Sequence, residues 1–314
     1  RKMLILYQKD GIKEDLLIIL VGLDAERPAR RCKIFGKNQI IGKKWFRDNA
    51  PENSLKVTSI FLTLQGEWPY SGRPAVFIRL SHCNLRCFFC DTYFDDGEFY
   101  TIQELRKMVH QKINDFYIPR GKDDIPVGIV ITGGEPMLQQ EVLTSFVNEM
   151  SEDNIDFIQI ETNGTVEPTD DFIDTGITIV VSPKCVEKNG KEVSYIKPSK
   201  KLLDYSHCLK FVLTSDTNSL YNKIPDWVDE YRGDVYISPI NVYNTEPRDL
   251  KIGKMFGEDR DIETRSTEDE VISFWTTGLL NLEENKKNHE YAAKYCLDNG
   301  HILQLQVHLY AGLA

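Results

Sequence analysis

The 314-residue chain is 41% hydrophobic and 27% charged, a balance that lets it bury a large core and excludes the disordered and collagen-like classes. Its 38 basic and 48 acidic residues give a formal net charge of -10. The average surface therefore repels nucleic acid and anionic membranes, and we expect neither as a partner.

Residues 1–56 have a mixed character that does not match the repeating units further along, and we predict that they form an N-terminal extension. Their apolar run at residues 16–23 falls well short of the ~20 residues that span a bilayer, and acidic rather than basic residues precede it. We therefore expect a cytoplasmic protein, in which clustered cysteines act as ligands or catalysts rather than as disulfides.

From residue 57 onward, short β-branched apolar runs alternate with segments of helical periodicity. Two of these segments, residues 101–117 and 138–154, predict helices, the first opening on Thr101 and the second following Pro136. Repeated strand and helix units have right-handed crossovers and indicate an α/β fold, as a barrel or an open sheet. The apolar runs predict parallel strands buried on both faces, at residues 74–80, 127–134, 156–164, 176–184, 208–215 and 234–240.

Polar or glycine-rich segments directly follow five of the predicted strands. They are the cysteine-rich loop, GGEP, ETNGT, SPK and SPIN. The carboxyl ends of parallel strands form the mouth of the site in α/β folds, so we expect all five segments to meet at one rim. Residues 244–288 break the rhythm: they are polar, acidic in the middle, and predict a partly helical insertion in a core domain of residues 57–314.

Three of the seven cysteines, Cys83, Cys87 and Cys90, have the spacing CxxxCxxC in a loop after a predicted strand. A structural zinc site needs four tetrahedral ligands, and His82, adjacent to Cys83, is poorly placed to complete one. Cysteines that only pack as small hydrophobes are expected on a strand or helix face. An iron–sulfur cluster on three thiolates keeps one iron open for a substrate or cofactor, which explains the missing fourth ligand.

The turn formed by Gly133, Gly134, Glu135 and Pro136 follows the next strand. Two glycines let the backbone approach a ligand closely, and an acid beside them can receive an ammonium group. The alternative is a tight turn with a solvated carboxylate, and the position of the turn on the same rim as the cysteines argues against it.

Together, the CxxxCxxC loop and the GGEP turn resemble the radical S-adenosylmethionine enzymes. The resemblance narrows to the 7-carboxy-7-deazaguanine synthase family, because six motifs occur in order: LQGEWPYSGRPAVFIRLSHCNLRCFFCDT, TGGEPMLQQ, ETNGT, SPK, LKFVL and LQLQVHLYAGLA. It covers nearly everything except the extension and the insertion, and it implies a partial TIM-like barrel with parallel strands. The chain departs from the family at Trp68, where a second glycine is usual, and at Phe89, where tryptophan is common; neither change removes a ligand.

The resemblance implies a [4Fe–4S] cluster on Cys83, Cys87 and Cys90, S-adenosylmethionine on its fourth iron, and a 5′-deoxyadenosyl radical made by reductive cleavage. The residues that it assigns to the S-adenosylmethionine side are Phe89, Asp91, Gly133, Gly134, Glu135, Asn163, Ser182, Pro183, Lys184, Ser238 and Pro239.

The implied substrate is 6-carboxy-5,6,7,8-tetrahydropterin, a flat ligand that needs amide and carboxylate side chains along its edge and a cation at its acid. The resemblance assigns to it Leu64, Gln65, Gly66, Glu67, Arg79, Thr132, His308 and the terminal Ala314. The alternatives are a structural ion pair for Arg79 and a packed core position for His308.

Thr92 follows the last cysteine and an aspartate, and the resemblance implies that its hydroxyl binds Mg²⁺ beside the substrate. The alternative is that Thr92 caps the following turn.

The implied reaction is that of a carbon–nitrogen lyase: hydrogen abstraction at C6, ring contraction, return of the hydrogen, and loss of ammonia to give 7-carboxy-7-deazaguanine. This product belongs to 7-deazapurine (queuosine-type) biosynthesis. The resemblance also implies a homodimer and an electron donor such as flavodoxin or ferredoxin.

Two other functions stay open on the sequence. An activase that makes a glycyl radical on a partner protein shares the cysteine loop and a GGE-like turn, but does not need LQGE or an ordered C-terminal end. A zinc-stabilised binding module would not be an enzyme at all.

We predict that the four remaining cysteines are structural: Cys32, Cys185, Cys208 and Cys296. Cys185 is the most ambiguous of them because it directly follows SPK.

Overall fold

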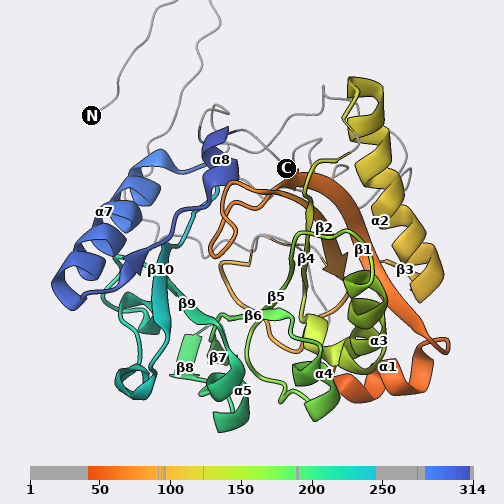
Figure 1. Cartoon of the computed structure of the whole chain (residues 1–314). Coiled ribbons are helices and arrows are strands. Elements are labelled where there is room, and N and C mark those ends of the chain that lie inside the picture. The colour runs from red at the N-terminus through yellow and green to blue at the C-terminus, as the bar shows by residue number, and fades with distance from the viewer. Residues whose placement is uncertain are drawn as a thin grey trace, which may run out of the picture. The chain divides into compact units, whose positions relative to one another are not determined.

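The structure, a computed structural model, describes residues 42–90, 92, 94, 97–122, 124–188, 191–244, 274 and 280–311 (Figure 1). All of them belong to one compact unit of residues 32–314. Most of the predicted extension and most of the predicted insertion lie outside the described residues. Among the helices that are described, none combines the length and the apolar character needed to cross a membrane.

A nine-stranded sheet forms the centre of the described fold, in the order β11-β10-β9-β6-β5-β4-β2-β1-β3. The pairs from β2 through to β11 are parallel, and β1 pairs antiparallel with β2 and β3. The sheet strands are β1 (Ser54–Leu64), β2 (Pro74–Leu80), β3 (Glu98–Thr101), β4 (Gly128–Gly133), β5 (Ile158–Thr162), β6 (Thr178–Val181), β9 (Cys208–Leu213), β10 (Asp234–Pro239) and β11 (Ile302–Leu303). The six predicted strands are therefore confirmed, as is the α/β class, in the form of a partial barrel that is open between β11 and β3.

Helices pack against this sheet, with α2 and α3 contacting β1 and α7 contacting β10 (Figure 1). The helices are α1 (Lys43–Asn49), α2 (Ile102–Tyr117), α3 (Gln140–Ser151), α4 (Asp170–Asp174), α5 (Lys200–Tyr205), α7 (Leu282–Asn299) and α8 (Val307–Ala311). Short 3-10 helices are η1 (Ile118–Arg120), η2 (Pro136–Gln139), η3 (Leu220–Asn222) and η4 (Asp226–Glu230). Both predicted helices are confirmed: Thr101 and Glu104 form a capping box at the start of α2, and Pro136 opens the η2 turn that leads into α3.

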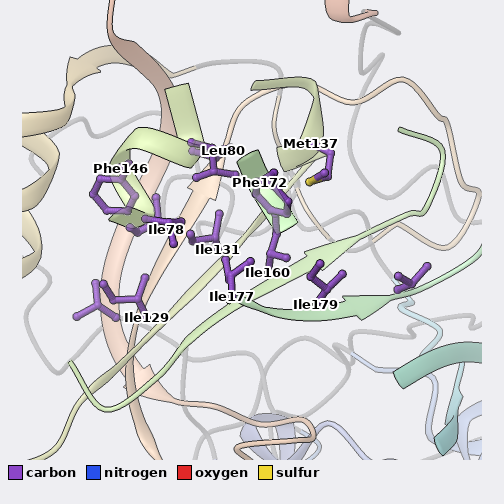
Figure 2. Close-up of a cluster of buried hydrophobic side chains, with 14 of the residues drawn as sticks. Ile78, Leu80, Ile129, Ile131, Met137, Phe146, Ile160, Phe172, Ile177 and Ile179 are labelled. Atoms are coloured by element: carbon purple, nitrogen blue, oxygen red, sulfur yellow. The ribbon is translucent and has the colours of Figure 1, made fainter. Parts of the chain in front are cut away.

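A row of isoleucines crosses the parallel strands in register and fixes them to one another (Figure 2). Ile78 on β2 pairs with Ile131 on β4, Ile131 with Ile160 on β5, and Ile160 with Ile179 on β6. None of the four is more than 2% exposed, and each contributes about 1.5–3 kcal/mol of burial free energy. Because this core holds the strands rigidly, their carboxyl ends can position loops with precision.

The antiparallel hairpin of β7 (Cys185–Lys188) and β8 (Lys191–Tyr195) was not among the predicted strands. It follows the SPK segment and forms a sheet separate from the large one. Tyr243 and Leu280 form an isolated antiparallel bridge, so the residue that precedes the predicted insertion pairs with one inside its last ten residues. The bounds of the extension and of the insertion stay predictions.

Candidate active site

A cavity of about 290 Å³ lies at the carboxyl ends of the parallel strands. Its walls come from the cysteine loop after β2, the turn after β4, the ends of β5, β6, β9 and β10, and helix α8. Segments far apart in the sequence thus converge on one rim, as predicted. The predicted site residues that line the cavity are Gln65, Glu67, Arg79, Cys83, Cys87, Phe89, Cys90, Thr92, Thr132, Gly133, Gly134, Asn163, Ser182, Lys184, Ser238, Pro239 and His308.

Six other predicted site residues do not line the cavity. Leu64, Gly66, Glu135 and Pro183 are described but are not among the residues that line it. Gly66 leaves room for its neighbour, because a side chain there would collide with the imidazole of His308. Asp91 and Ala314 lie outside the described residues.

The thiols of the cysteine loop have hydrogen-bond donors around them. Cys83 Sγ accepts from the Leu85 amide at 3.4 Å and from Asn163 Nδ2 at 3.8 Å. The Cys90 amide donates to the Cys87 carbonyl at 3.2 Å, which closes a turn between the two thiols. Burial, together with the nearby Glu135 carboxylate, raises the pKa of the Cys83 thiol to about 12, so the thiolate needs a bound cation to form at neutral pH.

The glycines after β4 bring the GGE turn against the backbone of the cysteine loop. Gly133 has a φ of 129°, and a Cβ there would collide with the backbone of Leu80. A Cβ on Gly134 would collide with the carbonyl of His82. The Gly134 and Glu135 amides donate to the Leu80 and His82 carbonyls at 3.0 and 2.8 Å. The close approach that the glycines permit in the structure is therefore to the loop that carries the cysteines.

Glu135 is fully buried below the cavity, and its carboxylate faces β5. It accepts from the Thr162 hydroxyl at 2.6 Å, from the Asn163 amide at 2.6 Å and from the Met137 amide at 3.0 Å. Burial raises the pKa of Glu135 to about 6, although these three donors favour the carboxylate. Glu135 thus ties the GGE turn to the end of β5, next to the Asn163 that contacts Cys83.

His82 supports the cysteine loop from the side of α1. Its ring lies edge-on to Trp45 at a centroid distance of 4.7 Å and tilted against Phe46 at 5.7 Å. Its Nε2 lies 3.2 Å from Lys56 Nζ. Burial and this ammonium lower the pKa of His82 to about 4, so its imidazole is neutral at neutral pH.

On the other side of the cavity, Lys210 lies between two carboxylates. Its Nζ donates to Glu161 Oε2 at 2.6 Å and also to Glu67 Oε2. Burial alone raises the pKa of Glu67, but the Lys210 ammonium reverses this and holds it below its ordinary value. The sequence motifs ETNGT and LKFVL contain Glu161 and Lys210, but the motifs alone predict no role for either residue. A buried ion pair could have been suspected, because Glu161 and Lys210 are charged residues inside two runs that were predicted to be buried strands.

Arg79 and Thr92 meet at a third part of the cavity wall, where Arg79 Nη1 donates to Thr92 Oγ1 at 3.1 Å. The guanidinium also lies over the Phe61 ring, 5.3 Å from its centroid. Thr132, at the end of β4, pairs with Arg79 in the strand register and lines the same cavity. A guanidinium and two threonine hydroxyls thus line the same cavity.

The SPK segment holds a second, partly buried ammonium. Lys184 Nζ donates to the Ser182 carbonyl at 2.8 Å and to the Ser182 hydroxyl, and burial lowers the pKa of Lys184. Ser182 is fixed in turn by donating to the Lys210 carbonyl at 2.8 Å.

Three of the four cysteines outside the loop are buried. Cys185 is 2% exposed, Cys208 1% and Cys296 6%, and their burial fits the structural role predicted for them. Cys32 lies outside the described residues.

Within the described residues, no three His, Cys, Asp or Glu side chains converge closely enough to hold a single metal ion. The three thiols instead stand around the wall of one cavity, next to a glycine-acid turn at the carboxyl edge of a parallel sheet. This arrangement of fold and site defines the class of radical S-adenosylmethionine enzymes. Residues 71–173 match the family model described as a 4Fe-4S single cluster domain, which is consistent with that class.

The comparisons with known proteins then identify the family. The 7-carboxy-7-deazaguanine synthase of Rickettsia prowazekii is 31% identical over 260 residues, which are 82% of this chain and 88% of that protein. The enzyme of the same name from Rhodospirillum rubrum is 40% identical over 152 residues, 48% of this chain and 57% of that protein. The crystal structure of QueE from Escherichia coli has a TM-score of 0.46 and 18% identity, covering 85% of this chain and 99% of that one. The chain belongs to the 7-carboxy-7-deazaguanine synthase family.

Proposed function

We propose that the chain is a radical S-adenosylmethionine lyase that converts 6-carboxy-5,6,7,8-tetrahydropterin into 7-carboxy-7-deazaguanine with loss of ammonia. One observation carries the proposal: the cluster cysteines, the two glycines of the GGE turn and the polar side chains assigned to the pterin line a single cavity, the last being Gln65, Glu67, Arg79, Thr132 and His308. A cofactor and a substrate bound there would be in contact, as a reaction that begins with hydrogen transfer between them requires.

The residues present fit the cofactor. Cys83, Cys87 and Cys90 would hold a [4Fe–4S] cluster, and the N–H donors on Cys83 Sγ are of the kind that stabilise a cluster thiolate. Asn163, Ser182, Lys184, Ser238 and Pro239 would contact S-adenosylmethionine. When bound, the cluster and S-adenosylmethionine supply a 5′-deoxyadenosyl radical. The GGE turn contributes by packing against the cysteine loop and fixing its position.

The substrate side of the cavity has the chemistry that a carboxylated pterin needs. Gln65, Glu67 and Glu161 offer amide and carboxylate groups to the N–H and carbonyl groups along the edge of the bicyclic ring. Arg79 offers a planar, permanently charged fork to the substrate carboxylate. Apolar side chains such as Phe77 and Leu309 line part of the cavity and would limit the access of water to the reacting atoms.

Magnesium is part of the same proposal. Thr92 presents its hydroxyl at the cavity wall, next to the arginine proposed to bind the substrate carboxylate. A Mg²⁺ ion there would take one protein hydroxyl together with substrate and water oxygens, a set that suits its preference for octahedral oxygen ligands. We also propose that the protein works as a cytoplasmic homodimer, receives electrons from a flavodoxin or ferredoxin, and serves 7-deazapurine biosynthesis.

The test is anaerobic turnover. Cluster-loaded protein is incubated with S-adenosylmethionine, the tetrahydropterin, Mg²⁺ and a reductant, and both 5′-deoxyadenosine and 7-carboxy-7-deazaguanine are measured by mass spectrometry. We expect both products, and neither from a variant in which all three cluster cysteines are alanine. Iron and sulfide analysis is done on the same sample. A full cluster with no deazaguanine product would refute the proposal, and zinc in place of iron would indicate the binding-module alternative.

A further inference from the structure

Lys210 joins three segments of the chain at the wall of the cavity. It stands in the middle of β9, only 9% exposed, and its ammonium reaches Glu67 after β1 and Glu161 at the end of β5. Glu67 is 7% exposed. A single buried cation therefore stands between a carboxylate in the loop after β1 and a carboxylate on β5, and both carboxylates line the cavity.

The hydrogen bonds of this group show what Lys210 does and does not offer to a ligand. Two of its three N–H donors are directed at the two carboxylates, so the ammonium is already engaged and the substrate carboxylate is left to Arg79. Glu161 Oε1 accepts from Gln159 Nε2 at 3.1 Å and from Gln65 Nε2 at 3.5 Å. These donors fix the plane of the Glu161 carboxylate, whose other oxygen is fixed by Lys210.

Two carboxylates this close cannot both ionise in a buried site without a cation between them. Burial opposes the charge on Lys210, but Glu161 and Glu67 more than offset it and raise the pKa of its ammonium. The other charged or titratable groups facing this set are Lys184 from the loop after β6, His308 from α8, and Cys208 on the same strand as Lys210. Lys210 is the one that contacts both carboxylates directly.

We propose that Lys210 is a positioning residue that holds Glu67 and Glu161 side by side as hydrogen-bond acceptors for the N–H groups along the pyrimidine edge of the substrate. The inference rests on the proposed function for the identity of the ligand. It adds a specific role: Lys210 acts through the two carboxylates, and their charged state depends on it. Without the ammonium, one carboxyl would keep a proton and present a donor where the pterin also presents a donor.

Lys210→Met tests this role, since methionine keeps the length of the side chain and removes the charge. We expect its dissociation constant for the tetrahydropterin to rise about tenfold or more, because each 1.4 kcal/mol is a factor of ten and an unpaired buried charge costs more than that. Binding is measured by anaerobic calorimetry on cluster-loaded protein with S-adenosylmethionine present. The affinity of Lys210→Met should recover as pH rises and the retained proton leaves, whereas the wild-type affinity should stay flat between pH 6.5 and about 8.5.

Two control variants and an infrared measurement separate a role of the Lys210 charge from a general loss of structure. Lys210→Arg keeps a cation and should bind the pterin more tightly than Lys210→Met, and Lys200→Met on α5, an exposed lysine paired with Asp204, should match the wild type. Infrared difference spectra of the pterin-free protein should show a protonated carboxyl band in Lys210→Met that the wild type lacks.

Absence of that band would overturn the inference, as would an unchanged and pH-independent affinity in Lys210→Met. If the wild type with a full cluster bound no pterin, the proposed function would fail, and the infrared comparison would still decide the role of Lys210. Should Lys210→Met not fold, Lys210→Gln replaces it in both measurements.

Discussion

Arg79 donates a hydrogen bond from Nη1 to the hydroxyl of Thr92 across 3.1 Å, and both residues line the same cavity. The first stands on β2 and the second follows the cysteine loop, so the contact ties the loop to the strand that precedes it. An oxygen that accepts from a guanidinium keeps a lone pair for a cation. The proposed carboxylate-binding arginine and the proposed magnesium ligand therefore act at the same end of the substrate.

Replacing Thr92 with valine should make turnover depend on a higher magnesium concentration. The substitution keeps the shape of the side chain and removes the oxygen, so we expect the Mg²⁺ concentration for half-maximal product formation to rise roughly tenfold or more. The measurement is product formation against Mg²⁺ concentration. Thr144→Val on α3, where the hydroxyl only bonds the Gln140 carbonyl, is the matched control. An unchanged magnesium dependence in Thr92→Val would leave Thr92 as a capping residue.

Glu187 on the β7–β8 hairpin holds the cysteine loop from outside the cavity. Its carboxylate accepts from the Phe88 amide at 3.0 Å, between Cys87 and Cys90. Glu187→Ala removes a hydrogen bond to a charged acceptor, worth about 1.5–3 kcal/mol, and should speed the loss of cluster absorption in the presence of a chelator by roughly tenfold or more. Glu187→Gln keeps an acceptor and should lie near the wild type. Equal rates in all three proteins would show that the hairpin does not stabilise the loop.

The strands and the cavity rim were predictable from sequence because each depends on local pattern. Runs such as residues 127–134 are apolar and β-branched, and the parallel topology that they imply places their carboxyl ends together. The β7–β8 hairpin was missed because its short, half-exposed strands carry neither pattern. Residues 185–195 are rich in charge and give only a weak strand signal.

The role of Lys210 could not be predicted for a different reason. A lysine inside an apolar strand signals a buried partner, but the partner's identity depends on which strands lie side by side. Glu67 and Glu161 are 143 and 49 residues away along the chain, and only the folded sheet brings them to the same ammonium. The contacts of Glu135 also depend on the fold. The sequence predicted the turn that contains Glu135, but it did not predict that the Glu135 carboxylate faces β5.

Gly134→Ala should separate the GGE turn from the cysteine loop. A Cβ at this position would meet the carbonyl of His82, a backbone atom that cannot rotate away. The strain of overpacking is about 1–3 kcal/mol, which predicts a loss of roughly 5- to 160-fold in the rate of 5′-deoxyadenosine formation per cluster. Gly42→Ala, where a Cβ meets no atom within 4 Å, is the control. A wild-type rate in Gly134→Ala would mean that the turn and the loop do not need this contact.

Phe146→Ala should weaken the core without touching the cavity. Phe146 on α3 is fully buried in the cluster that contains the isoleucine row, and it does not line the site. Truncating a buried phenylalanine costs about 3–5 kcal/mol, which corresponds to a fall in Tm of roughly 5–8 °C for a chain of this size. Phe116→Ala on α2, where the ring is 44% exposed, should cost under about 1 kcal/mol. Thermal unfolding of the cluster-loaded protein measures both. Activity per folded molecule should stay near the wild type in Phe146→Ala at low temperature, and a selective loss of turnover there would show that the sheet core also tunes the site.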